Sequence, residues 1–169
     1  MNHHVAGRCN SRRPTCQRYG SRGNALVELA MIIVPMTALM FAIVDFGLAI
    51  FARSSMQHAV REGVRYAVTY QTKSGMGHDA SIKDVVQQNS MGFLKGPAGL
   101  EKIHVRYYAP DSLVEVPENA PGNVVEVSVE GYNWNWIVPI MRTKTPWTIT
   151  VRSGDRMEGL PGGTAPPAR

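Results

Sequence analysis

The sequence predicts an α+β fold in which one long N-terminal helix carries a second, short helix and a small antiparallel sheet. Two observations lead to this prediction. Residues 25–51 are almost wholly apolar, and helical spacing follows them without a break. Residues 103–151 then contain three runs of alternating apolar and polar residues, which are typical of half-buried strands. The sheet cannot bury its apolar face alone, so we expect it to pack on the outer half of the long helix.

The chain's formal charge of +5 resides in its first 22 residues. Five of its 18 Lys and Arg residues lie there and none of its 13 Asp and Glu residues does, so the chain from residue 24 onward has no net charge. A surface that binds nucleic acid needs positive charge clustered on a folded domain. The sequence therefore predicts no nucleic-acid partner, and residues 1–23 are interpreted as a basic leader.

The apolar run is long enough to cross a lipid bilayer, which requires roughly 20 apolar residues. A buried core helix of this length would need a larger surrounding domain than the remaining residues supply. A cleaved secretory signal is the other alternative, but its apolar run is about 7–15 residues long. We expect a transmembrane helix over residues 24–52. The positive-inside rule then places the leader in the cytoplasm and the rest of the chain in the periplasm.

Helical spacing continues beyond the apolar run to Tyr70, before a glycine-containing turn at residues 74–77. The two stretches are expected to form one helix of about 47 residues and about 70 Å, with its second half outside the bilayer. Pro35 is expected to bend this helix, because proline removes one helical hydrogen bond and clashes with the preceding turn.

A second helix is expected after the glycine turn. Asp79 or Ser81 can cap it, and an apolar stripe continues to about Leu94. A Gly-Pro-Ala-Gly segment at residues 96–99 would stop it.

The alternating runs centre on residues 103–107, 125–129 and 147–151. Together with the second helix, these strands would form a periplasmic or extracellular α+β domain over residues 53–158. The Pro, Gly and Ala content of residues 159–169 predicts a disordered tail.

The junction between leader and apolar run carries the most informative motif. Gly23 ends the basic leader, and Glu28 is the fifth residue of the segment that follows. This pattern resembles the processing site of type IV pilins. The resemblance implies that a prepilin peptidase cuts after Gly23 and leaves Asn24 as the first residue. Glycine suits such a cut because it presents no side chain and can adopt an extended backbone.

Glu28 is unusual in its own right. A carboxylate at the centre of a span costs about 2.5–3.5 kcal/mol, and less near the interface. The positive end of the helix dipole stabilises the carboxylate and offsets roughly 0.3–1 kcal/mol of this cost. Resemblance to pilins implies that Glu28 pairs with the N-terminal amine of a neighbouring subunit during assembly. The alternative is an interfacial acid at the start of an ordinary anchor.

The resemblance becomes more specific toward the TadE-like family of the Tad (Flp) pilus system. Such proteins read Arg-Gly-x3-Val-Glu-Phe-Ala, then an apolar run ending in an acid before Phe-Gly, then a segment similar to Ala-x-Arg-Glu-Gly-Ala-Arg-Tyr-Ala. The counterparts here are Arg22-Gly23, Val27-Glu28-Leu29-Ala30, Asp45-Phe46-Gly47 and residues 59–67. Leu29 replaces the usual aromatic residue, and Asn24 replaces a smaller one.

The resemblance implies a pilin-like fold and a minor pilin, or pseudopilin, that takes part in initiation, assembly or tip formation of a Tad-type type IV pilus. It implies a location in the bacterial inner membrane or in the extracellular pilus. Its partners would be the prepilin peptidase, other Tad pilins and minor pilins, the inner-membrane assembly platform and the lipid bilayer. The competing hypothesis is an unprocessed, single-pass membrane-anchored periplasmic binding module, and processing at Gly23 distinguishes the two.

Asp45 is the second acid in the apolar run, and we expect it near the outer membrane–water interface. Two interpretations stay open for it. It contacts the stalk of another pilin in assembly, or it is an acid whose side chain reaches the interface on its own.

Enzymatic readings are not supported by any motif. Nucleophile-elbow, zinc-protease, P-loop and dinucleotide-binding patterns are missing from the sequence, so we expect no enzyme and no cofactor. Cys9 and Cys16 fit no common zinc spacing, so we expect no metal. Trp134, Trp136 and Trp147 could form a binding platform, but core or membrane-interface positions are more typical of such residues.

Overall fold

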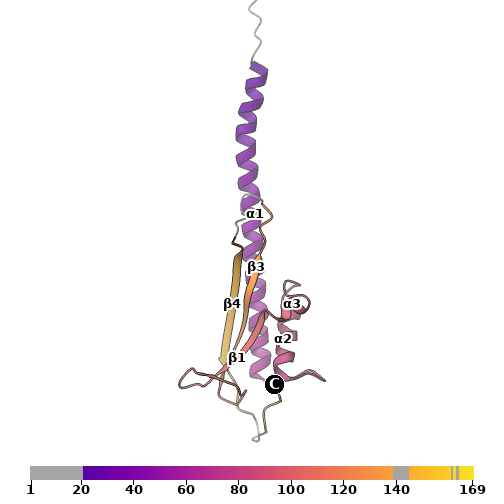
Figure 1. The fold of residues 1–169 in the computed structure, drawn as a ribbon, viewed down its shortest axis with the longest axis vertical. Coiled ribbons are helices and arrows are strands. Elements are labelled where there is room, and N and C mark those ends of the chain that lie inside the picture. The colour runs from indigo at the N-terminus through magenta and orange to yellow at the C-terminus, as the bar shows by residue number, and fades with distance from the viewer. Residues whose placement is uncertain (1–20, 139–144, 161, 163) are drawn as a thin grey trace, which may run out of the picture. The chain divides into compact units, whose positions relative to one another are not determined.

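A computed structural model of the chain describes residues 21–138, 145–160, 162 and 164–169. These residues divide into two units, one ending at Leu39 and one beginning at Met40. Helix α1 (Ser21–Val68) begins in the first unit and continues into the second (Figure 1). Most of the leader, residues 1–20, lies outside the described part of the chain.

The first unit consists of the N-terminal turns of α1. Nearly all of its described side chains are exposed, although most are large and apolar. Thr37 is a polar residue in this stretch, and its hydroxyl donates hydrogen bonds to the carbonyls of Ile33 (2.8 Å) and Val34 (3.0 Å). The helix assignment runs through Pro35. By length and composition, α1 can cross a membrane.

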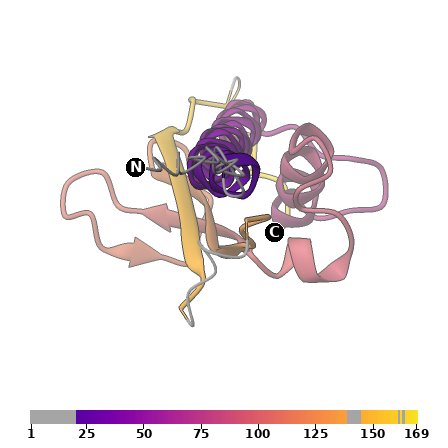
Figure 2. The ribbon, with the colours of Figure 1, turned by 90° about the horizontal axis from the view of Figure 1, so that it is seen from above.

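The second unit adds two helices and a four-stranded antiparallel sheet to the remaining turns of α1. The helices are α2 (His78–Asn89) and α3 (Pro97–Leu100). The strands are β1 (Ile103–Tyr108), β2 (Glu115–Val116), β3 (Val124–Trp134) and β4 (Trp147–Arg156), in the order β2-β1-β3-β4. Figure 2, which looks along α1, shows α2 and α3 on one side of this helix and β4 on the other. The predicted α+β class is confirmed.

The core lies between the sheet, α2 and one face of α1. Met56 and Val60 of α1, Ile82 of α2 and the inward residues of β3 are all fully buried. Gly63 shows how closely these elements approach, because a Cβ on it would lie 2.4 Å from Val86 Cγ2. A glycine therefore lets α1 touch α2 here. The expected packing of the sheet on the outer half of the long helix is present.

The packed domain begins earlier on α1 than the expected boundary at residue 53. Asp45, Ala49 and Ala52 lie one helical turn apart and are all buried within the second unit. They form the same face as the core residues that follow. The sequence obscured this boundary, because apolar residues suit both a lipid-facing and a core-facing surface.

Helix α2 ends at Asn89 rather than near Leu94. Met91 and Gly92 both adopt positive φ angles, of 52° and 89°, which a helix cannot continue through. The Ser90 hydroxyl then accepts a hydrogen bond from the Leu94 amide (3.2 Å) and closes the turn. The glycine–proline segment that was expected only to stop this helix instead starts α3, with Pro97 in its first turn.

The sheet has one more strand than the alternation predicted, because β2 is only two residues long. Strand β3 also extends beyond the predicted run at residues 125–129, as far as Trp134. The pairing with β4 shifts register between Val129 and Tyr132, and Gly131 has a φ of 70° at this irregularity.

The prediction of a disordered tail is wrong for the last residues of the chain. Pro167, Ala168 and Arg169 make hydrogen bonds to α2 and to the residues around β2. Composition predicted disorder, but the interactions of the arginine and of two backbone carbonyls hold this end on the domain.

Candidate functional site

The predicted processing site lies in the first turns of α1. Gly23 and Asn24 are both helical and exposed. A Cβ on Gly23 would meet nothing within 4 Å, so packing within the chain does not require glycine there. Cleavage between them needs this end of the helix to open locally, and helix ends fray readily.

Glu28 lies one helical turn beyond Asn24, in the first unit. It is exposed, and its neighbours Val27 and Leu29 are exposed and apolar. The Glu28 side chain makes no hydrogen bond or ion pair with any other described residue. Its carboxylate is therefore available to a group outside the part of the chain that the structure describes.

Asp45, in the second unit, is in the opposite situation. Its side chain is only 1% exposed, and its Oδ2 accepts hydrogen bonds from the backbone amides of Ile137 (2.8 Å) and Val138 (3.0 Å). A buried carboxylate is costly unless hydrogen-bonded, and bonds to an ionised acceptor are among the strongest in proteins. Asp45 thus holds the segment after β3 against α1.

This contact gives Asp45 a role within the chain that neither interpretation drawn from the sequence included. The carboxylate is buried within the chain, where Oδ2 accepts both backbone hydrogen bonds and Oδ1 has no partner among the described residues. The partner amides lie 92 and 93 residues further along the chain. Because they are backbone groups, no side-chain pattern could have indicated them.

The aromatic residues around this contact are ordered. Trp136 and Trp147 stack, with ring centroids 5.6 Å apart and planes 13° from parallel. Trp134 pairs with Trp147 across β3 and β4 and packs against the core. The backbone amide of Ile137 donates to Asp45, and most of the Ile137 side chain is exposed. Residues 139–144, in the connection between β3 and β4, lie outside the described residues.

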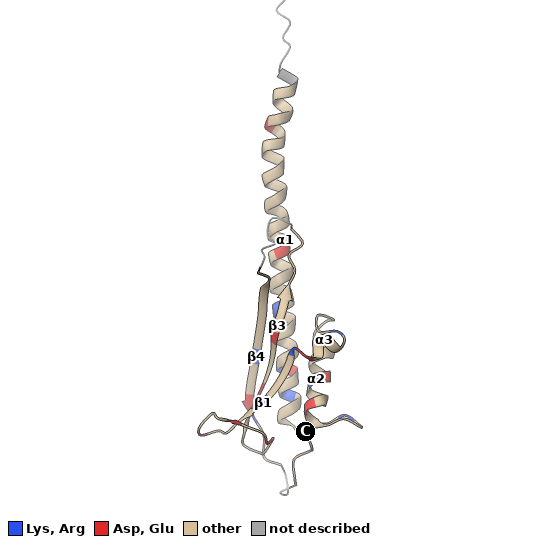
Figure 3. Cartoon of the chain, in the orientation of Figure 1, with Lys and Arg blue, Asp and Glu red and all other residues tan. Residues whose placement is uncertain are grey.

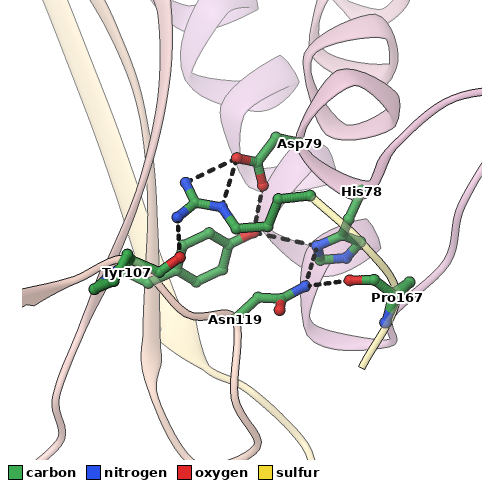
Figure 4. Close-up of polar contacts among 7 residues, drawn as sticks. His78, Asp79, Tyr107, Asn119 and Pro167 are labelled. Carbon is green, nitrogen blue, oxygen red and sulfur yellow. Dashed lines mark hydrogen bonds and ion pairs between the residues drawn. The ribbon is translucent and has the colours of Figure 1, made fainter. Parts of the chain in front are cut away.

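A second polar cluster, at the start of α2, was not predicted. We call it the tail clasp, and it joins residues 167–169 to four side chains on α2, β1 and the segment before β3 (Figure 4). The four side chains are those of His78, Asp79, Tyr107 and Asn119.

Arg169 provides most of the clasp's contacts. Its guanidinium donates twice to Asp79 Oδ2, at 2.8 and 2.9 Å, and also to the Pro117 carbonyl. The same group lies 4.7 Å from the centre of the Tyr107 ring, a cation–π geometry.

The backbone of the tail is also recognised. The His78 amide donates to the Ala168 carbonyl (2.8 Å), and Asn119 Nδ2 donates to the Pro167 carbonyl (2.9 Å). A side chain at position 77 would collide with the tail, because a Cβ on Gly77 would lie 2.6 Å from the Arg169 carbonyl oxygen. The tail therefore fits the domain closely.

A buried hydrogen-bond chain supports the clasp. The Tyr107 hydroxyl donates to Asp79 Oδ1 (2.8 Å), so its oxygen is free to accept from His78 Nδ1 at 3.1 Å. Burial lowers the pKa of His78, and the Arg169 charge acts in the same direction, against the opposite effects of Asp79 and the Ala67 carbonyl. Burial, followed by the hydrogen bond to Asp79, raises the pKa of Tyr107. The clasp is built for a neutral histidine and a neutral tyrosine.

Neither cluster has the composition of a metal site. Within the described ranges of the chain, no three His, Cys, Asp or Glu residues lie close enough together to hold a metal ion.

The candidate residues near the N-terminus lie within a segment that matches a known protein family. Residues 23–65 match the family described as TadE-like protein. This TadE-like segment begins at Gly23 and includes Asn24, Glu28 and Asp45, so the resemblance predicted from the sequence is confirmed over this stretch. It covers about a quarter of the chain and does not reach α2, the sheet or the tail clasp. No curated protein and no solved structure matches the chain.

Proposed function

We propose that the protein is a minor pilin, or pseudopilin, that takes part in initiation, assembly or tip formation of a Tad-type pilus. In this proposal α1 anchors the chain in the inner membrane, with its leader in the cytoplasm and its α+β domain in the periplasm. A prepilin peptidase removes residues 1–23, and the mature chain joins other pilins through α1. The role is structural rather than enzymatic.

One observation carries the proposal. The TadE-like segment begins at the glycine that ends a leader with five arginines. The family match therefore starts at Gly23, the residue after which a prepilin peptidase would cut.

Glu28 supports an assembly role. Its carboxylate is exposed among apolar side chains and unpaired within the described residues. Such a group is unfavourable in lipid unless a positive partner reaches it. Removal of the leader would create an ammonium on Asn24 of each subunit, which is a suitable partner when two subunits lie side by side.

The processing test uses the full chain expressed with and without a prepilin peptidase, followed by intact-mass measurement and N-terminal sequencing. The expected mature chain begins at Asn24 only when the peptidase is present. Gly23→Val should block this cut. Gly47→Val is the matched control, because a Cβ on either glycine meets nothing within 4 Å. A chain that stays full length with the peptidase favours the unprocessed, membrane-anchored binding module.

Participation in a pilus needs a separate measurement. The mature chain should co-purify with other pilins of its own Tad system, and loss of the gene should reduce the number of pili. Processing without co-purification would contradict the pilin proposal.

A further inference from the structure

Several apolar side chains gather around one level of α1, where the packed domain begins. Phe51 on α1 is 49% exposed, Met91 after α2 is 70% exposed, and Ile137 after β3 is 61% exposed. Trp147 at the start of β4 is 37% exposed and stacks on Trp136. We call these five residues the apolar collar.

Contacts within the second unit fix the collar at this level. Asp45 binds the Ile137 amide at 2.8 Å, and the Ser55 hydroxyl lies 3.5 Å from Met91 Sδ. The Phe51 ring packs edge-on against Phe93, at 6.2 Å between centroids. The segments that supply the collar are therefore attached to α1 between residues 45 and 55.

The described residues at this end of the sheet are uncharged. No Lys, Arg, Asp or Glu occurs among the described residues 131–138 and 145–151. The last charged residue of β3 is Glu130 and the first of β4 is Arg152, so the strand ends next to the collar are tan in Figure 3. Soluble domains seldom leave an uncharged, exposed apolar surface without a partner.

We propose that the collar lies in the membrane–water interface of the outer leaflet, so that the domain rests directly on the bilayer. This inference depends on the part of the proposed function in which α1 crosses the membrane. The occupant of the collar is lipid, in the zone between headgroups and acyl chains.

The length of the apolar run favours this occupant. The helix from Asn24 to Val44 is about 30 Å long, which matches the hydrocarbon core of a bilayer. A span that begins at Asn24 therefore ends at Asp45, where the collar is attached. Within the second unit, exposed apolar side chains of α1 follow one another from Met40 to the collar residue Phe51.

The residue types in and beside the collar also favour lipid as its occupant. Tryptophan is enriched at membrane interfaces, where its ring contacts apolar lipid and its N–H contacts water. Arg53 is exposed two residues after Phe51 and is the first basic residue beyond the apolar run. Its side chain is placed to reach lipid phosphates while its methylenes stay at the interface.

The test uses tryptophan quenching by brominated lipids. The chain has three tryptophans, all in or beside the collar. The full-length protein is reconstituted into phosphatidylcholine vesicles with bromine either near the headgroup or near the acyl-chain end. A variant retaining only Trp147, with Trp134→Phe and Trp136→Phe, reports on the collar. Two tryptophan-free backgrounds carry Tyr108→Trp in β1, or Phe41→Trp in α1.

Shallow bromines should quench Trp147 at least about twofold more than the reporter at position 108, as expected for an interfacial ring. Deep bromines should quench the reporter at position 41. Quenching at position 41 with none at Trp147 overturns the collar inference while leaving the anchor intact. A lack of quenching at position 41 refutes the anchor itself. If Trp147 changes its emission only when other pilins are added, the collar is a protein interface and the inference is wrong.

Discussion

Replacing Asp45 by alanine should release the segment after β3 from α1. Both hydrogen bonds that hold this segment fall on the same oxygen, Oδ2. Each hydrogen bond to a charged group contributes about 1.5–3 kcal/mol, and part of this gain is offset because the variant no longer buries a carboxylate. We therefore expect the attachment of the segment to weaken by about 2–4 kcal/mol, which raises its open population roughly 30- to 1,000-fold.

Asp45→Asn is the matched control. Because one oxygen accepts both bonds, the amide oxygen of asparagine can accept them in the same place. The variant loses only the charge assistance, about 1 kcal/mol. It also keeps the volume of the side chain, so packing around Ala49 should be unchanged.

Hydrogen exchange of the full-length protein, read by mass spectrometry, measures this directly. In Asp45→Ala the amides of Ile137 and Val138 should exchange faster by the factor given above, and in Asp45→Asn only slightly faster. The amide of Val127, in the paired part of β3, should not change in either variant. If Ile137 and Val138 exchange at the wild-type rate in Asp45→Ala while co-purification with other pilins falls, Asp45 acts between subunits and the reasoning is refuted.

Further predictions concern other parts of the chain. Glu28→Leu should leave membrane insertion intact but sharply reduce co-purification with pilins at equal membrane levels, with Glu28→Asp intermediate; full assembly of the leucine variant would make Glu28 an interfacial acid only. Gly63→Ala should destabilise the domain by about 1–3 kcal/mol in chemical unfolding, because its Cβ would overlap Val86, whereas Gly47→Ala should not destabilise it. Arg169→Ala should lower the free energy of unfolding by about 1–2 kcal/mol through loss of the ion pair and cation–π contact; an unchanged value would contradict the clasp.

The pH dependence of stability tests the buried histidine of the clasp. The pKa of His78 in the folded protein lies below its ordinary value of 6.5. Between these two values the unfolded chain binds a proton that the folded chain does not, so stability is full above about pH 6.5 and is lost as the pH falls below it. Unfolding midpoints measured from pH 8 to pH 5 should fall more steeply for the wild type than for His78→Gln. Parallel curves would contradict a neutral histidine in the clasp.

Local patterns predicted most of the fold. The helical spacing that continues to Tyr70 predicted that the outer half of α1 would pack against the sheet, and the buried residues from Met56 to Ala67 form that face. The alternation of Val125, Val127 and Val129 likewise identified the buried face of β3. These predictions needed only neighbouring residues.

The remaining features depend on contacts between distant residues. Strand β2 has two residues and exists only because it pairs with Tyr107 and Tyr108. The tail is ordered because one arginine meets Asp79, 90 residues earlier in the chain. Neither partner is signalled by local composition, and composition favoured disorder for a Pro- and Gly-rich end.

The two acids of the apolar run show why structure was needed to separate them. In sequence, Glu28 and Asp45 are alike: each is a carboxylate within a stretch that suits lipid, and each resembles a position of the TadE-like pattern. In the structure, Asp45 is buried and its Oδ2 accepts from two amides of its own chain, whereas the Glu28 side chain is exposed and unpaired among the described residues. A charged group in lipid is costly unless a partner reaches it. In the proposed function, the partner of Glu28 is the N-terminal ammonium of another subunit, whereas Asp45 attaches the segment after β3 to α1.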